Sequence, residues 1–196
     1  MTITILLLAA GQSSRMRGRD KLLEEIDGQP LLRLMAGRAC KAGVAVRVVL
    51  GPDQAARQAA LADLSVDIVT ATQGDGMAAS IRAGVAGLTG PVLVVLADMP
   101  EITAQDLYLM VSLGAHAPTA ILQAASPAGM PGHPVLFPAD LLPELSQLRG
   151  DQGAKAVLAK QAARVTLLPL ADARATVDLD TPEDWAAWHA KRSPTT

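Results

Sequence analysis

Short apolar runs alternate along this chain with longer, mixed stretches. Residues 3–8 and 92–96 consist almost entirely of Ile, Leu and Val, whereas the stretches between such runs are amphipathic or rich in alanine. The first pattern predicts strands that are covered on both faces, and the second predicts helices. Their regular alternation predicts an α/β fold with a mostly parallel central sheet.

Strands are predicted at residues 3–8, 47–50, 66–70, 92–96, 120–124, 133–137 and 164–168. Helices are predicted near 31–42, 53–60, 76–86, 103–113, 139–148 and 151–161, with a last helix from Thr181. The runs 3–8 and 92–96 should be central and parallel. The 133–137 strand should be antiparallel or at an edge, because the Pro- and Gly-rich stretch 127–134 precedes it. We expect one domain over residues 1–191 and a frayed tail over 192–196.

Composition narrows the possible partners. Half of the 196 residues are hydrophobic, but only four are aromatic, so the core must be aliphatic. The net charge of −2 and the scarcity of stacking side chains argue against a nucleic acid polymer as partner. Cys40 alone cannot form a disulfide within the chain, which favours a reducing, cytoplasmic location. No apolar stretch approaches the ~20 residues that a membrane span requires, and no signal-peptide pattern is present.

The loop that follows residues 3–8 has the composition of a phosphate-binding loop. Ala9, Ala10 and Gly11 lack bulk, so the backbone can approach a ligand and its N–H groups can point at an anion. Four basic side chains follow: Arg15, Arg17, Arg19 and Lys21. The alternative interpretation is an ordinary connection with solvated arginines.

Asp98 follows the other apolar run, so its carboxylate should emerge at the edge of the sheet. Such an aspartate could anchor Mg²⁺, which takes one or two carboxylates beside phosphate oxygens and water. Ligands of open parallel sheets bind outside the carboxyl ends of the strands, so Asp98 should share a crevice with the first loop. The alternative is that Asp98 only starts a turn before Pro100.

Residues 178–184 offer a second group of carboxylates. Asp180 or Thr181 is a suitable N-cap, Pro182 fits the first helical turn, and the acidic residues that follow favour the positive helix end. Capping explains most of this segment without a metal. It leaves Asp178 unexplained.

Two further segments are candidates for substrate contact. Gly76 and Ser80 mark a helix start that could receive a sugar or a base, although a flexible helix N-terminus explains the same residues. His133 has no metal-ligand spacing to His116 or His189, so it is a candidate substrate contact and not a zinc ligand. The entrance to the 151–161 helix, with Asp151, is explained equally by capping and by function. We find no Gly-x-Ser-x-Gly elbow and no P-loop spacing.

Six segments in order resemble the molybdenum-cofactor cytidylyltransferase family, part of the MobA-like NTP transferase superfamily. They are Leu-Ala-Ala-Gly at 8–11 with 14–16 and 21–23, and the segments 76–84, 96–100, 132–137, 150–155 and 178–184. The resemblance implies a three-layer, Rossmann-like nucleotidyltransferase fold. It implies a reaction that joins CTP to the phosphate of molybdenum-bearing molybdopterin, gives a cytosine dinucleotide and pyrophosphate, and requires Mg²⁺. The product could pass to a molybdoenzyme.

The resemblance also implies residue roles. The residues that would line the nucleotide pocket are Leu8, Ala9, Ala10, Gly11, Gly76 and Ser80. Arg15 and Lys21 would clamp the triphosphate, Asp98 and Asp180 would hold the metal with Asp178 as the alternative to Asp180, and His133 would lie near the acceptor. The family usually has Arg-Met-Gly, whereas here Arg17 stands between Met16 and Gly18. It therefore stays open whether Arg17 or Arg19 also reaches phosphate. The Ala-Ala-Gly start favours cytidine, because related guanylyltransferases tend to have Ala-Gly-Gly.

Nucleotidyl transfer agrees with the lack of a candidate nucleophile, because attack by a phosphate needs alignment and charge neutralisation. Three alternatives stay open. The first is a nucleotidyltransferase that uses another NTP, such as GTP, or another acceptor, such as a sugar phosphate. The second is a non-catalytic nucleotide- or cofactor-binding module, and the third is an α/β oxidoreductase, although no Gly-x-Gly-x-x-Gly follows residues 3–8.

Overall fold

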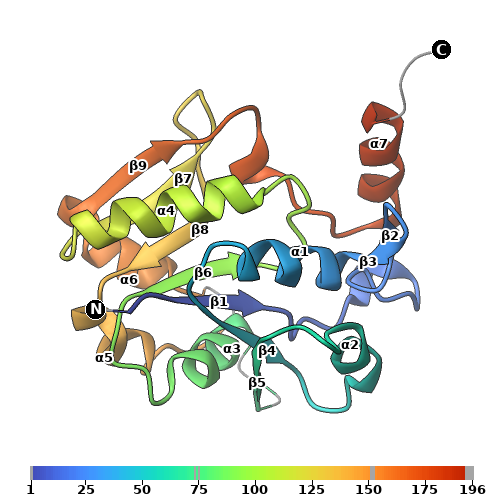
Figure 1. Ribbon diagram of the computed structural model, residues 1–196, viewed down its shortest axis with the longest axis horizontal. Helices are drawn as coiled ribbons and strands as arrows, with labels where there is room; N and C mark the ends of the chain where they lie inside the picture. The colour runs from blue at the N-terminus through green and yellow to red at the C-terminus, as the bar shows by residue number, and fades with distance from the viewer. Residues whose placement is uncertain (1, 73, 75, 151–152, 193–196) are drawn as a thin grey trace.

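A seven-stranded sheet forms the middle layer of the computed structural model, which describes residues 2–72, 74, 76–150 and 153–192 (Figure 1). Its strand order is β5-β4-β1-β6-β8-β7-β9. The strands are β1 (Thr4–Leu8), β4 (Ala45–Leu50), β5 (Asp67–Thr70), β6 (Val92–Leu96), β7 (Ile121–Ala125), β8 (Pro131–Phe137) and β9 (Val165–Pro169). All neighbouring strands are parallel except β8, which is antiparallel to both β6 and β7. The α/β fold with a mostly parallel sheet is therefore confirmed.

The two most apolar strands are central, as predicted. Leu8 pairs in register with Val49 of β4 on one side and with Leu96 of β6 on the other. Leu6 and Leu7 point to opposite faces and are both fully buried. Because β1 and β6 are parallel neighbours, the loops that leave their carboxyl ends start side by side.

Strand β8 is antiparallel, as one of the two alternatives predicted, but it lies inside the sheet and not at its edge. The prolines are accommodated at the irregular start of the strand: Pro131 lies opposite Ala125 beyond the register shift, and neither Pro131 nor Pro134 pairs with β6. Pairing with β6 starts only at Val135, and the ladder with β7 is irregular between Gln123 and Ala125, opposite the proline-rich part. An interior strand can therefore contain Pro131 and Pro134 among its first four residues.

Helices cover both faces of the sheet (Figure 1). They are α1 (Leu31–Cys40), α2 (Ala55–Ala60), α3 (Gly76–Val85), α4 (Ala104–His116), α5 (Leu142–Leu145), α6 (Lys155–Lys160) and α7 (Pro182–Arg192). The core side chains of α1, α4 and α7 gather on one face with Ile5 and Leu7. Those of α3, α5 and α6 gather on the other face with Leu6 and Leu8. The alternating side chains of β1 thus join two largely aliphatic cores, which also contain Trp185, Trp188 and Phe137, in three layers.

The structure corrects three details of the predicted elements. The helix expected at 139–148 is a 3-10 turn (Ala139–Leu141) followed by α5, with Pro143 in the first turn of α5. The 151–161 helix begins only at Lys155, and Asp151 lies outside the described residues. A small hairpin, β2 (Glu25–Ile26) and β3 (Gln29–Pro30), precedes α1.

The last helix, α7, extends to the end of the described part of the chain. Arg192, which the sequence predicts in the tail, is the last residue of α7 and pairs with Asp27, whereas 193–196 lie outside the described residues. No helix in the described part of the chain has the length and apolarity to cross a membrane.

Close packing of α3 on β1 gives a prediction. A Cβ atom added at Gly84 would lie 2.3 Å from Leu6 Cδ1, whereas one added at Gly37 of α1 would meet nothing within 4 Å. We expect Gly84→Ala to lower the free energy of unfolding by about 1–3 kcal/mol through overpacking. The control Gly37→Ala should raise it by up to about 1 kcal/mol, since alanine is the better helix former. Urea unfolding measures both, and equal stability of the two variants would contradict the packing.

Candidate active site

The carboxyl ends of β1 and β6 open into a cavity of about 600 Å³. Its walls come from the loop after β1, Gly51 and Pro52 after β4, Ala71 and Thr72 after β5, the start of α3, Leu96 and Asp98 of the β6 end, and Asp178 and Asp180. The shared crevice predicted for the first loop and Asp98 is therefore present. Among the lining residues are Leu8, Ala9, Ala10, Gly11, Arg15, Lys21, Gly76 and Ser80.

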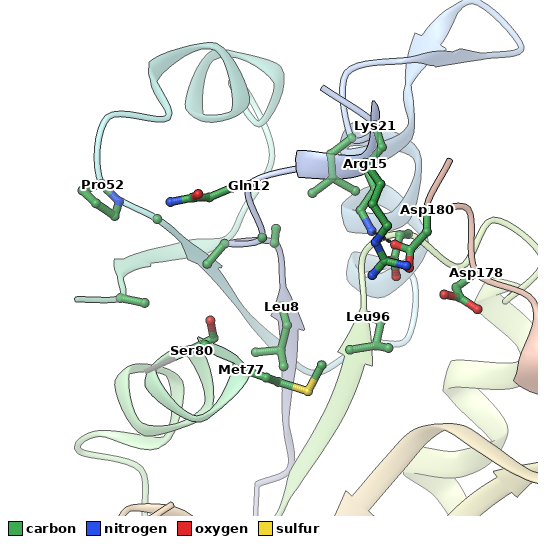
Figure 2. A pocket seen from close by; sticks show the side chains of 18 of the residues that line it. Leu8, Gln12, Arg15, Lys21, Pro52, Met77, Ser80, Leu96, Asp178 and Asp180 are labelled. Atoms are coloured by element: carbon green, nitrogen blue, oxygen red, sulfur yellow. Dashed lines mark hydrogen bonds and ion pairs between the residues drawn. The ribbon is translucent and has the colours of Figure 1, made fainter. Parts of the chain in front are cut away.

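A lysine between two carboxylates, Asp98 and Asp180, marks one end of this cavity; Lys21 and Asp180 are labelled in Figure 2. The Lys21 ammonium donates hydrogen bonds to Asp98 Oδ2 and, at 2.5 Å, to Asp180 Oδ1. Arg15 Nη1 lies 2.8 Å from the other oxygen of Asp180. Burial lowers the pKa of Lys21, but the Asp98 and Asp180 carboxylates outweigh it and hold that pKa above its ordinary value. Lys21 is therefore a fixed cation at neutral pH.

Three carboxylates gather around this lysine. One oxygen from each of Asp98, Asp178 and Asp180 lies within 4.8 Å of the others. Asp98 Oδ1 is buried and accepts no hydrogen bond in the described part of the chain. Partial burial, followed by the charges of Asp98 and Asp180, raises the pKa of Asp178. Clustered carboxylate oxygens with a spare buried acceptor fit a hard divalent cation such as Mg²⁺ or Mn²⁺.

The local structure of α7 frees Asp180 for this cluster. Thr181, and not Asp180, caps the helix, since its hydroxyl accepts from the Asp184 N–H at 3.1 Å. The Asp184 carboxylate accepts in return from the N–H groups of Thr181 and Asp180. Capping is thus complete without the Asp180 side chain, which extends toward Lys21 and Arg15.

The opposite end of the cavity is uncharged among the residues that Figure 2 labels. Pro52 and Gln12 lie on one side of it, and Ser80 and Met77 of α3 lie on the other. The cavity therefore has one end lined by charged side chains and another lined by uncharged ones.

His133 lies in a second, adjoining cavity of about 450 Å³. This cavity shares Met77, Leu96 and Asp178 with the first one. Burial lowers the pKa of the His133 imidazole, and its Nδ1 atom is buried with no hydrogen-bond partner among the described residues. His133 is therefore a mostly buried, neutral ring in the second cavity, and its Nδ1 atom has no partner in the described part of the chain.

The two other arginines of the first loop lie away from the cavity lining. Arg17 pairs with Glu183, and Arg19 Nη1 lies 3.3 Å from Glu24 Oε2. Both arginines are exposed, and neither lines the first cavity. Of the three arginines, Arg15 alone lines this site in the described structure.

Arg57 supports the loop and was not predicted from the sequence. Arg57 of α2 is only 2% exposed. It donates to both oxygens of Asp20 at 2.7 Å, to the Ala9 carbonyl at 2.5 Å and to Ser13 Oγ at 3.1 Å. The available signal was a single charge within the Ala-Ala-Arg-Gln-Ala-Ala segment, a poor place for a solvated arginine.

Comparison with known proteins agrees with this geometry. Residues 5–165 match the family model of the MobA-like NTP transferase domain. The bifunctional protein GlmU of Anaeromyxobacter dehalogenans is 32% identical over 138 residues, which is 66% of this chain and 28% of that protein. The chain thus spans about a quarter of the length of the curated relatives it matches.

Solved structures extend the likeness to almost the whole chain. Rv0371c from Mycobacterium tuberculosis H37Rv has a TM-score of 0.82 at 27% identity, covering 96% of this chain and 98% of that one. Its complex with manganese has a TM-score of 0.80 at 26% identity, covering 95% and 97%. Molybdopterin-guanine dinucleotide biosynthesis protein A from Archaeoglobus fulgidus shares the fold alone, with a TM-score of 0.69 at 16% identity over 97% of this chain and 100% of that one.

Proposed function

Because the chain belongs to the MobA-like NTP transferase domain family, we propose that it transfers the cytidylyl group of CTP to the phosphate of molybdopterin bearing molybdenum. One observation supports this most directly: Lys21 and Arg15 meet the acidic cluster at the end of β6, in a cavity large enough for a nucleotide. This arrangement offers charge neutralisation and alignment, which are what phosphoryl-type transfer requires.

The cavity suggests how CTP lies. The base and ribose would occupy the uncharged end near Pro52, Gly76 and Ser80, and the triphosphate would extend along the first loop toward Arg15 and Lys21. The α-phosphorus would then lie near Asp98, at the boundary with the second cavity. This orientation gives each end of the nucleotide a matching environment.

The second cavity is the proposed acceptor site. Its wall is mainly apolar and includes Met77, Met99 and Met130, whose flexible thioethers adapt to irregular ligands. His133 and Lys155 add polar contacts in that cavity. Such a lining suits a fused-ring molecule with a phosphate better than a sugar rich in hydroxyl groups, which would leave many polar groups unpaired.

The residues fit the Mg²⁺ that the family resemblance implies. Asp98 and Asp180 would hold the ion, with Asp178 beside them, and the manganese complex of Rv0371c supports a divalent cation in this fold. A bound divalent cation would polarise phosphate oxygens and balance the charge of the leaving pyrophosphate. Asp98 Oδ1, a buried oxygen that accepts no hydrogen bond in the described part of the chain, is a candidate ligand atom.

The reaction balances without a protein nucleophile. An oxygen of the acceptor phosphate forms a bond to the α-phosphorus of CTP, and the bond from that phosphorus to the bridging oxygen breaks, so that pyrophosphate leaves with the electron pair. Lys21 and Arg15 neutralise negative charge on the triphosphate and the leaving group. The acceptor oxygen is already anionic at neutral pH, so no general base is needed. The dinucleotide product would then be available to a molybdoenzyme.

Removal of the central charges tests the catalytic assignment. We expect Lys21→Ala and Asp98→Ala each to lower turnover by about 100-fold or more, because each removes charge stabilisation from the transition state. Lys160→Ala, which removes an exposed lysine that pairs with Glu144, is the matched control and should keep normal turnover. Pyrophosphate release with CTP, molybdenum-loaded molybdopterin and Mg²⁺ measures the rates. Near-normal rates in folded Asp98→Ala would contradict the metal assignment, and no pyrophosphate release by the wild type would favour a non-catalytic module.

Nucleotide choice is tested separately by thermal stability. A ligand that binds only the folded state raises the melting temperature, so CTP with Mg²⁺ should shift Tm more than GTP, ATP or UTP at equal concentration. Ala10 lines the cavity at the position where related guanylyltransferases tend to have glycine, so Ala10→Gly should reduce the preference for CTP over GTP. A larger shift with GTP in the wild type would show that the chain is not a cytidylyltransferase.

A further inference from the structure

Helix α2 and the residue before it support the loop after β1 with two side chains, Arg57 and Gln54, that do not line the cavity. Arg57 Nη1 donates to the carbonyl of Ala9 at 2.5 Å, and Gln54 Nε2 donates to the next carbonyl, that of Ala10, at 3.2 Å. Gln54 is held in turn, because its Oε1 accepts from the Gly51 N–H at 2.7 Å. Two consecutive carbonyls of the loop therefore point toward α2.

This arrangement determines the direction of the neighbouring N–H groups. In a trans peptide the carbonyl of one residue and the N–H of the next point to opposite sides. The N–H groups of Ala10 and Gly11 therefore point away from α2, and both residues line the cavity. Neither N–H donates to an acceptor within the part of the chain that the structure describes. Successive N–H groups of this kind form an anion-binding site.

The same arginine also fixes the other end of the loop. Arg57 Nη2 donates to Ser13 Oγ, and that hydroxyl oxygen accepts from the Lys21 backbone N–H at 3.2 Å. Burial alone would raise the pKa of Asp20, but the hydrogen bonds and charge of Arg57 outweigh it and hold this pKa below its ordinary value. Asp20 is therefore ionised at neutral pH and keeps the guanidinium in place at both oxygens.

We propose that Arg57 and Gln54 are positioning residues for the triphosphate: they hold the Ala9 and Ala10 carbonyls back so that the N–H groups of Ala10 and Gly11 face the phosphates. This inference rests on the proposed function, because it assigns the loop to the triphosphate. It differs from a merely structural role for α2, which would affect folding stability without changing anion affinity in the folded protein.

Inorganic triphosphate, measured by isothermal titration calorimetry, is the probe. Gln54→Glu keeps the acceptor for Gly51 but places an oxygen against the Ala10 carbonyl, and Arg57→Met removes the guanidinium. Each should weaken triphosphate binding by about tenfold or more, the size of a lost hydrogen bond to a charged group. Arg57→Lys, which keeps one charged donor, should restore part of the affinity.

Arg33→Met is the matched control. Arg33 donates to the Ala60 and Ala62 carbonyls at the other end of α2, so its loss disturbs the same helix without touching the loop. It should bind triphosphate like the wild type, while urea unfolding reports the stability of every variant. If Arg57→Met does not fold, Gln54→Glu and Asp20→Asn decide the question.

The outcomes separate the two proposals. Binding by the wild type and Arg33→Met, with weaker binding by Gln54→Glu and Arg57→Met, supports the positioning role. Equal binding by all folded variants would overturn that role and leave the proposed function standing. No binding of triphosphate by the wild type would overturn the positioning role, while pyrophosphate release from CTP would still decide the proposed function.

Discussion

The pairing of Lys21 with Asp98 and Asp180 is the interaction on which the site depends. It joins the first loop, the end of the central strand β6 and the segment before α7 in one partly buried place. A buried charge is costly unless it is paired, so each of these segments holds the others in position. Two cations, Lys21 and Arg15, face three carboxylates there, and the excess negative charge is what a divalent cation would balance.

The order of strands in the sheet brings Lys21 and Asp98 close together. Because β1 and β6 are parallel and adjacent, with Leu8 opposite Leu96, the loop after β1 and Asp98 leave the same edge at the same level. Aliphatic cores on both faces keep these two strands rigid, and Gly84 lets α3 approach β1 closely. A precise site at the ends of rigid strands can then be lined by loops of varied chemistry.

Much of this could be predicted from the sequence, because it depends on local pattern. The apolar runs predict central strands, and parallel strands predict that Lys21 and Asp98 share an edge. Interactions between distant residues could not be predicted in this way. Arg57 donates hydrogen bonds to Asp20, 37 residues away, and to Ala9, 48 residues away. The sequence around Arg57 therefore does not indicate these partners. The interior position of β8 could not be predicted either, since it depends on which residues of β8 pair with β6 and not on the prolines themselves.

A crystal structure of the protein with CTP and Mg²⁺ would test the central claim most directly. We predict phosphate oxygens within ion-pair distance of Lys21 and Arg15 and within hydrogen-bond distance of the Gly11 N–H, with the metal ion bound by Asp98. Phosphates bound away from Lys21, or a metal held without Asp98, would contradict the account.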